Sequence, residues 1–146
     1  MADIQSLADD VIPLAESFIA ALKAQGIRHV VTSTNRTTAE QVALYAQGRE
    51  SLEKVNTKRQ IAGMFPIQPS ENQYTVTNAD GIKHKSAHQG GRALDVVPAS
   101  AAGNPVWPGP SDPRWKAIGE IGEAVGFEWG GRWKDLPDFP HYQRKA

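Results

Sequence analysis

The chain has 146 residues, no cysteine, and 16 Lys and Arg residues that balance 16 Asp and Glu residues, so its formal net charge is zero. Zero net charge argues against broad nucleic-acid binding, which draws most of its affinity from phosphate neutralisation, and the absence of cysteine excludes disulfides, a thiolate nucleophile and a cysteine-based zinc site. A chain of this length indicates one domain, residues 1–146, with a hydrophobic core of its own.

The first ten residues, MADIQSLADD, are acidic and polar, and they lack the charged and apolar segments of a secretory signal peptide. No apolar run in the chain approaches the roughly 20 residues that a membrane helix needs. We therefore expect a protein that is made in the cytoplasm without a signal peptide and does not insert stably into a membrane.

The first third of the chain has the apolar spacing of two amphipathic helices. In residues 6–26 apolar side chains recur every three or four positions, but Pro13 predicts that the first turn is separate. A short strand is predicted over residues 28–34. A second helix is predicted over residues 37–48, with a threonine at its N-cap.

The middle of the chain is the least regular part. Residues 50–72 contain room for a short helix and a turn-rich stretch, and we interpret them as a surface insertion. The sequence QYTVT, residues 73–77, predicts a strand, and GRALDVV, residues 91–97, predicts a buried strand.

The last third begins with SDPRWKAIGEIGEAVG, residues 111–126, which predicts a helix with Pro113 in its first turn. The tail that follows predicts short extended pieces separated by glycines and prolines. Helices and strands are mixed without a repeating strand–helix alternation, which predicts the α+β class.

The stretch SAHQGGRALDVVP, residues 86–98, places His88 and Asp95 seven positions apart. Seven extended residues span about 23 Å, whereas two ligands of one metal ion bring their donor atoms within about 4 Å of each other. The chain would therefore have to bend between them, and Gly90 and Gly91 tolerate the positive φ that such a bend uses. The alternative is a glycine turn with a surface histidine and a salt-bridged aspartate.

A second pair of metal-binding residue types lies in DFPHYQ, where Asp138 precedes His141 by three positions. A catalytic zinc takes three protein ligands and keeps one position open. His88, Asp95 and His141 would supply two imidazoles and one carboxylate, and Asp138 would remain free to accept a proton. The alternative is a solvated aspartate and a surface histidine.

These motifs resemble those of the M15 family of zinc peptidases. SAHQGGRALD matches the family pattern S-x-H-x-x-G-x-A-x-D, and DFPHYQ is similar to its second motif, an acidic residue three positions before a histidine. NRTTAEQVALYAQGR, residues 35–49, resembles the family's arginine-containing segment and the glutamine that follows it. The family includes D-alanyl-D-alanine carboxypeptidases and dipeptidases, and phage endolysins that cut the L-alanyl-D-glutamate bond.

The resemblance implies a role for each matching residue. His88, Asp95 and His141 would bind one zinc ion per chain, Asp138 would be the general base, and Arg36 would stabilise the oxyanion. The candidate substrate-binding residues are Ser86, Gln41, Trp129 and Trp133.

The resemblance also implies a single domain of the kind shared by D-Ala-D-Ala metallopeptidases and the Hedgehog signalling domain, with a small central antiparallel sheet flanked by helices. The short chain and the aspartate at position 138 favour an endolysin-type L-alanyl-D-glutamate endopeptidase that degrades the bacterial cell wall. It would act on peptidoglycan stem peptides as a monomer, after release from the cytoplasm of the host by a bacteriophage holin. The alternatives are a D-alanyl-D-alanine carboxypeptidase and a non-catalytic zinc-containing binding module of the same fold.

Other assignments remain open from the residues alone. His84 and His88 have the H-x-x-x-H spacing of a helical zinc pair, although KHKSAHQGG is a poor helix former. Ser86, His88 and Asp95 suggest a serine triad, but the chain has no G-x-S-x-G elbow and the triad leaves DFPH unexplained. Glu128 in GFEWGG is the second candidate for the general base. A structural phage protein with incidental motifs is the last alternative.

Overall fold

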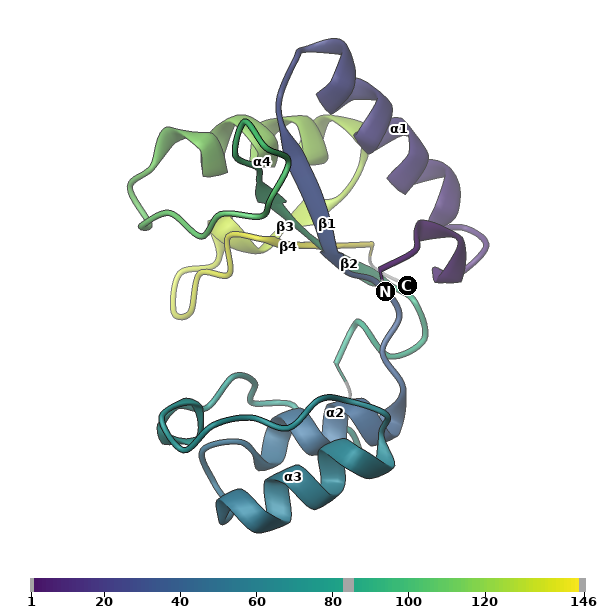
Figure 1. The fold of residues 1–146 in the computed structure, drawn as a ribbon. Coiled ribbons are helices and arrows are strands. Elements are labelled where there is room, and N and C mark those ends of the chain that lie inside the picture. The colour runs from purple at the N-terminus through teal and green to yellow at the C-terminus, as the bar shows by residue number, and fades with distance from the viewer. Residues whose placement is uncertain (1, 83–85, 145–146) are drawn as a thin grey trace. The chain divides into compact units, whose positions relative to one another are not determined.

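The computed structural model describes residues 2–82 and 86–144. The chain divides into two compact units, the first formed by Met1–Asn35 with Gly90–Ala146 and the second by Arg36–Gln89. The first unit contains the β-sheet with helices α1 and α4, and the second contains helices α2 and α3 (Figure 1). Helices and an antiparallel sheet in one small chain confirm the predicted α+β class.

The sheet of the first unit is antiparallel, and its strand order is β1-β2-β4-β3. In this register Asp95 lies opposite Ser33 on one neighbouring strand and opposite His141 on the other. Strand pairing therefore brings together residues that are far apart in the sequence. The strands are β1 (His29–Ser33), β2 (Ala93–Pro98), β3 (Glu128–Trp129) and β4 (His141–Gln143).

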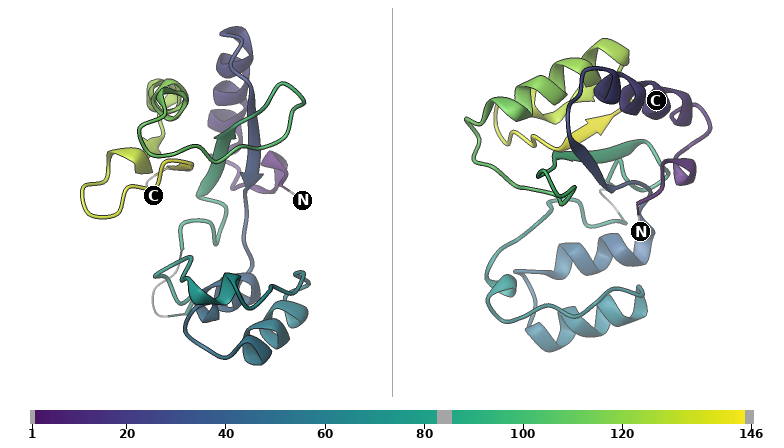
Figure 2. Two further views of the ribbon diagram at one scale, coloured as in Figure 1. Left: turned by 60° about the vertical axis from the view of Figure 1, so that its left-hand side comes forward. Right: turned by 45° about the horizontal axis from the view of Figure 1, so that its top comes forward.

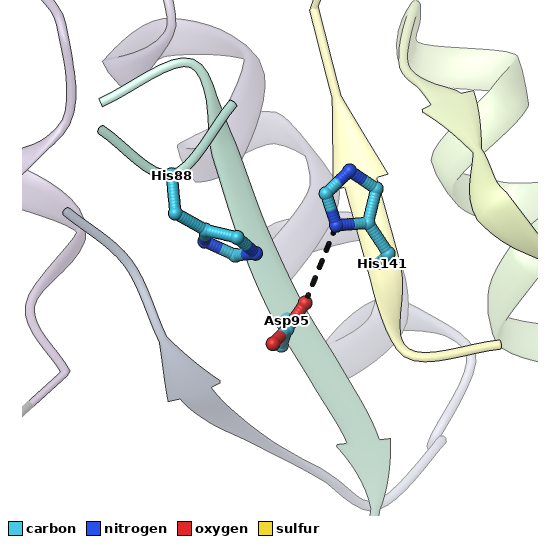
Figure 3. A group of neighbouring side chains, drawn as sticks. All are labelled: His88, Asp95 and His141. Carbon is cyan, nitrogen blue, oxygen red and sulfur yellow. Dashed lines mark ion pairs between the residues drawn. The ribbon is translucent and has the colours of Figure 1, made fainter. Parts of the chain in front are cut away.

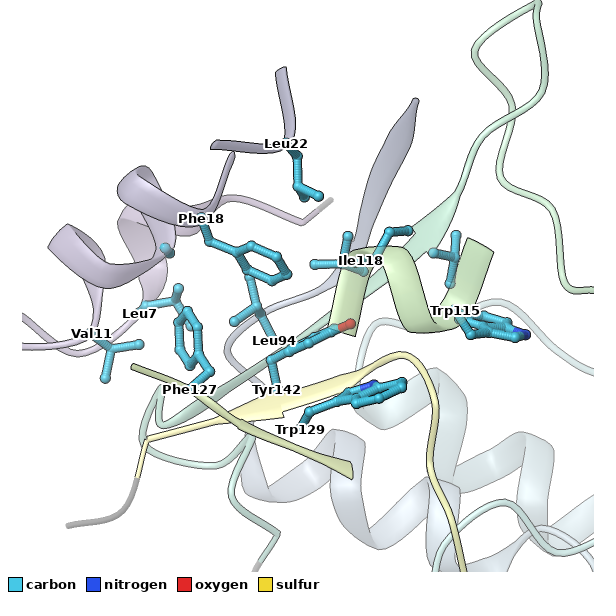
Figure 4. Packing of buried hydrophobic residues seen from close by; sticks show 13 residues of the cluster. Leu7, Val11, Phe18, Leu22, Leu94, Trp115, Ile118, Phe127, Trp129 and Tyr142 are labelled. Carbon is cyan, nitrogen blue, oxygen red and sulfur yellow. The ribbon is translucent and has the colours of Figure 1, made fainter. Parts of the chain in front are cut away.

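The main hydrophobic core lies between this sheet and helices α1 (Ile12–Ala24) and α4 (Pro113–Val125), which run along the sheet (Figure 2). Phe18 of α1 and Tyr142 of β4 meet in its centre with ring centroids 4.7 Å apart (Figure 4). Aromatic pairs at this separation add to the stabilisation from burying their area. The sheet is thereby fixed to both helices.

Side chains alternate between the two faces of a strand, and around Asp95 and His141 this alternation places the neighbouring core residues on the opposite face. Leu94 and Val96 of β2 and Tyr142 of β4 belong to the core cluster. Asp95 lies between Leu94 and Val96, and His141 is next to Tyr142, so Asp95 and His141 project from the face opposite these three residues. The core thus supports the candidate site from behind.

Local signals explain where the helices begin. α1 starts at Ile12 with Pro13 in its first turn, where no helical partner is needed for a backbone N–H, and a separate 3-10 turn, η1 (Ile4–Ser6), precedes it. The helix predicted over residues 6–26 therefore begins only at Ile12, and Pro13 lies at its start instead of in its interior. α4 starts after Asp112, whose side chain accepts a hydrogen bond from the backbone N–H of Arg114.

In the second unit α2 (Thr38–Ala46) and α3 (Leu52–Ile61) pack against each other around Ala46, Val55 and Ile67. The predicted cap of α2 is confirmed: the Thr37 side chain and Glu40 exchange hydrogen bonds with each other's backbone N–H groups.

Residues 50–72 contain α3 and the start of a 3-10 turn, η2 (Glu71–Gln73), and they contribute Val55 and Ile67 to the small core of the second unit. The segment is therefore more than a surface loop. Its origin as an insertion, and the single catalytic domain over residues 1–146, stay predictions.

The strand predicted over residues 73–77 is wrong. Within the described residues this segment pairs with no strand, and Tyr74 and Val76 are 68% and 54% exposed. β-propensity reflects a fit to a half-buried sheet surface, so this segment does not form a strand without a partner strand.

No helix in the described part of the chain combines the length and the apolar character needed to cross a membrane.

Candidate active site

Two neighbouring strands carry an imidazole and a carboxylate that face each other. Asp95 of β2 and His141 of β4 are direct partners in the sheet, and His141 Nδ1 lies 3.7 Å from Asp95 Oδ1 (Figure 3). The His141 side chain is only 8% exposed and that of Asp95 22%. Central strands hold side chains more precisely than loops do, so this pair is a rigid mount for a ligand.

His88 completes a group of three possible metal ligands. His88, Asp95 and His141 each offer one ligand atom, and these atoms all lie within 4.8 Å of one another (Figure 3). Two imidazole nitrogens and one carboxylate oxygen are donors that zinc takes in proteins. The residues present therefore fit a zinc ion.

The bend predicted after His88 is confirmed, because Gly90 and Gly91 adopt φ of 88° and 75°. The Gly91 carbonyl accepts a hydrogen bond of 3.1 Å from the Ala8 backbone N–H. A Cβ at Gly91 would lie 2.5 Å from the Ala8 nitrogen, whereas a Cβ at Gly90 would meet nothing within 4 Å. Gly91 is thus required by its conformation and by a close contact, and Gly90 by its conformation alone.

Asp138 lies beside His141 on a loop that backbone hydrogen bonds hold in place. Asp138 Oδ2 is 3.9 Å from His141 Nδ1, and the Asp138 side chain is 49% exposed. The Asp138 backbone N–H donates to the Gly130 carbonyl at 2.9 Å, and the His141 N–H donates to the Asp138 carbonyl at 3.2 Å. A half-exposed carboxylate in this position is accessible to water, as a proton acceptor must be.

The comparisons with known proteins agree with this geometry. Residues 80–144 match an M15 peptidase family model described as D-alanyl-D-alanine carboxypeptidase. The chain is 32% identical to the peptidoglycan L-alanyl-D-glutamate endopeptidase CwlK of Bacillus subtilis (strain 168), in an alignment that covers 92% of this chain and 73% of CwlK. The chain belongs to the M15 family of peptidases. M15 peptidases are zinc-dependent, and this chain is a metallopeptidase that acts on peptidoglycan.

The fold of this M15 peptidase is shared with other peptidases whose structures have been solved. The Serratia marcescens L-Ala D-Glu endopeptidase ChiX matches with a TM-score of 0.57 and 20% identity over 97% of this chain and 83% of ChiX. The vancomycin resistance D,D-pentapeptidase VanY, solved with Zn(II), matches with a TM-score of 0.57 and 17% identity over 94% of this chain and 72% of VanY. The predicted fold of DD-peptidase type is therefore confirmed.

The electrostatic surroundings of His141 in this M15 peptidase act in opposite directions. Burial by itself lowers the pKa of the imidazole, but the nearby Asp95 carboxylate, the hydrogen bond with Gln143 and the charge of Asp138 together raise it above its ordinary value. The surroundings therefore attract positive charge. A metal ion that binds there must displace any proton held by the ligand nitrogen.

Two tryptophans predicted to bind substrate occupy different environments. Trp129 is 4% exposed and belongs to the core cluster, and its indole N–H donates to the Phe139 carbonyl at 2.8 Å. This placement gives Trp129 a packing contact that supports the segment from Asp138 to His141, and it does not favour a contact with substrate. Trp133 is half-buried, with its ring centroid 5.1 Å from that of His141. Its contact with substrate stays a prediction.

Arg36 and Gln41 are linked within the second unit. Arg36 Nη1 donates to Gln41 Oε1 at 2.8 Å, and the Arg36 backbone N–H donates to the His88 carbonyl at 2.9 Å. Gln41 is fully buried, and its amide nitrogen donates to Thr77 Oγ1 and the Ala79 carbonyl at 3.1 and 2.9 Å. Both ends of the Gln41 amide are therefore engaged in holding Arg36 and the segment from Thr77 to Ala79. This burial is at odds with the predicted contact between Gln41 and substrate.

Ser86 forms part of the turn that presents His88. Its hydroxyl accepts a hydrogen bond of 3.2 Å from the His88 backbone N–H, and its own N–H donates to Gln89 Oε1 at 2.8 Å. The predicted contact of Ser86 with a ligand or substrate stays a prediction. His84, the alternative ligand, lies outside the described residues.

The sequence interpretation missed Gln143, which contacts His141 from the side opposite Asp95. His141 Nε2 lies 2.7 Å from Gln143 Oε1, and Gln143 Nε2 donates to Glu128 Oε2 at 2.7 Å. The sequence does contain a signal for this contact. His141 and Gln143 are two positions apart in DFPHYQ, and this spacing places both side chains on one face of a strand. Glu128, the second candidate for the general base, is instead bonded to this amide.

Proposed function

We propose that this M15 peptidase is a zinc-dependent endopeptidase that cuts the L-alanyl-D-glutamate bond of peptidoglycan stem peptides. The observation that carries the proposal is the convergence of the His88, Asp95 and His141 ligand atoms within 4.8 Å. The choice of bond is supported by the 32% identity to CwlK, an L-alanyl-D-glutamate endopeptidase.

His88, Asp95 and His141 would hold one zinc ion per chain. When bound, zinc acts as a Lewis acid and lowers the pKa of water toward neutrality. The two imidazoles bind through neutral nitrogens and Asp95 through its anionic carboxylate, so the ligand set cancels one of the two positive charges. The occupied site would therefore keep a net charge of +1.

Asp138 would accept the proton of the water that attacks the scissile carbonyl, and then donate this proton to the leaving amine. Its exposure of 49% and its position beside His141 support this role. The guanidinium of Arg36, which stays charged at all relevant pH values, would stabilise the negative charge that develops on the carbonyl oxygen. The hydrogen bond from Arg36 to the buried Gln41 restricts the guanidinium in advance.

We place this activity in a bacteriophage endolysin that is made in the host cytoplasm, reaches the cell wall after holin-mediated release and works as a monomer. The support is the similarity of its motifs to the endolysin branch, including an aspartate in place of glutamate at position 138.

A second function, D-alanyl-D-alanine carboxypeptidase, is favoured by the description of the family model that matches residues 80–144. The two activities release different products from one substrate. A synthetic pentapeptide stem ending in D-alanyl-D-alanine therefore separates them when the products are identified by mass spectrometry.

We expect the zinc-loaded protein to separate L-alanine from the D-glutamyl peptide and to leave the C-terminal D-alanine in place. Release of D-alanine alone would overturn the endopeptidase assignment in favour of the carboxypeptidase. If zinc-loaded protein binds the stem peptide but cleaves neither bond, the non-catalytic binding module is the correct description. Asp138→Asn is the control for contaminating hydrolases.

A further inference from the structure

Glu128, Gln143 and His141 form a continuous chain of hydrogen bonds on the side of His141 that faces away from Asp95. Glu128 and Gln143 are direct partners across β3 and β4, and His141 and Gln143 lie two residues apart on the same face of β4. The two contacts are both 2.7 Å long. Backbone pairing in the sheet therefore sets the positions of all three side chains.

The chemistry of the three groups assigns the direction of each hydrogen bond. An ionised carboxylate has no hydrogen and can only accept, so Glu128 requires the amino end of the Gln143 amide. The carbonyl end of the same amide must then face His141 Nε2, and a carbonyl oxygen also only accepts. His141 Nε2 is consequently the ring nitrogen that carries the hydrogen. His141 Nδ1 is left with its lone pair pointing toward Asp95.

We propose that Glu128 and Gln143 are positioning residues that hold His141 in the tautomer able to bind the metal through Nδ1. This inference rests on the proposed zinc site and deepens it. Neither residue has to touch zinc or substrate for this role, since both act through His141.

Without this hydrogen-bond chain the tautomer would be biased the wrong way. Asp95 Oδ1 and Asp138 Oδ2 lie 3.7 and 3.9 Å from His141 Nδ1, and two carboxylates attract a hydrogen to the nitrogen they face. A hydrogen on Nδ1 blocks the lone pair that the metal needs. The Gln143 carbonyl opposes this bias by taking the hydrogen on the far nitrogen, and Glu128 prevents the Gln143 amide from turning over.

Glu128→Gln tests the proposal with almost no change in shape. An amide at position 128 can accept as well as donate, so it no longer dictates which end of Gln143 faces His141. Gln143→Leu removes the acceptor altogether and serves as a second variant. Glu120→Gln is the matched control, because this carboxylate lies on α4 with its side chain 57% exposed and pairs with Lys116.

Two measurements report on the tautomer and on the metal. Nitrogen-15 NMR of the zinc-free protein, at a pH where the ring is neutral, shows which nitrogen of His141 carries hydrogen. Competition with a chelator gives the zinc dissociation constant. We expect wild type and Glu120→Gln to carry the hydrogen on Nε2, and Glu128→Gln and Gln143→Leu to shift it toward Nδ1 and to weaken zinc binding about 10- to 100-fold.

The proposal is overturned if wild-type His141 carries its hydrogen on Nδ1, or if Glu128→Gln leaves both the tautomer and the zinc affinity as in Glu120→Gln. If Gln143→Leu fails to fold, the result for Glu128→Gln alone tests the proposal. Wild-type protein that shows the expected tautomer and zinc affinities but cleaves no stem peptide would contradict the proposed function and leave the positioning role intact. Wild-type protein that binds no zinc would overturn both.

Discussion

Two aspartates stand beside the same nitrogen of His141, and their surroundings suit them to different tasks. Asp95 projects from the central strand β2 with its side chain 22% exposed, whereas Asp138 lies in a loop and is 49% exposed. A metal ligand benefits from a rigid mount, and a proton acceptor must exchange protons with water. This contrast in mount and exposure supports the proposed roles of Asp95 as a ligand and Asp138 as the base.

We predict that Asp138→Asn lowers kcat/KM for stem-peptide hydrolysis by about 100- to 10,000-fold, the usual contribution of a general acid or base. Zinc content, measured by elemental mass spectrometry, should stay at one per chain. Asp95→Asn is the contrasting variant and should lose zinc as well as activity. An Asp138→Asn protein with near wild-type hydrolysis would show that another group accepts the proton.

The neighbour of His141 in β4 faces the opposite way and permits a prediction about stability. The Tyr142 hydroxyl is buried in the core, finds no hydrogen-bond partner in residues 2–82 and 86–144, and its pKa is raised well above the ordinary value by burial. Burying an unsatisfied hydroxyl is costly, so Tyr142→Phe should raise the free energy of unfolding by on the order of 1 kcal/mol. Urea denaturation measures this change. A destabilised variant would reveal a partner for the hydroxyl, and zinc affinity should not change.

At the scale of elements, the bend before β2 determines how the chain enters the sheet. Ala at Gly90 would suffer only the unfavourable left-handed conformation, which costs about 1–2 kcal/mol. Ala at Gly91 would add a clash with the Ala8 backbone, so Gly91→Ala should cost about 3 kcal/mol or more. Thermal unfolding of the two variants compares them. If the two variants lose the same amount of stability, the segment around Ala8 moves freely to make room for the added Cβ.

At the scale of the whole molecule, motifs with fixed internal spacing could be predicted from the sequence and long-range pairing could not. The motif around His88 and the Gly90–Gly91 bend were predicted, because the metal chemistry and the glycine conformation are both local requirements. Gln143 was missed because its partner Glu128 is set by the β3–β4 register. Burial of Gln41 depends on a segment 36 residues away, which no local pattern reveals.

The proposed ligands lie in two motifs that are far apart in the sequence, so the unfolded chain contains no preformed zinc site, and zinc binding should stabilise the folded protein. Free zinc at about 100 times its dissociation constant would add about 2.7 kcal/mol to the free energy of unfolding. We therefore predict that a chelator lowers the Tm of the wild type and that added zinc restores it.

His141→Ala removes one ligand and should make Tm insensitive to both treatments, although this variant starts from its own baseline. Differential scanning calorimetry at several free zinc concentrations measures the dependence directly. Mass action fixes how steeply the free energy of unfolding rises with the logarithm of free zinc. A wild-type slope that corresponds to one bound ion per chain would match a single site. A zinc-dependent shift of the same size in His141→Ala would place the ion elsewhere in the chain.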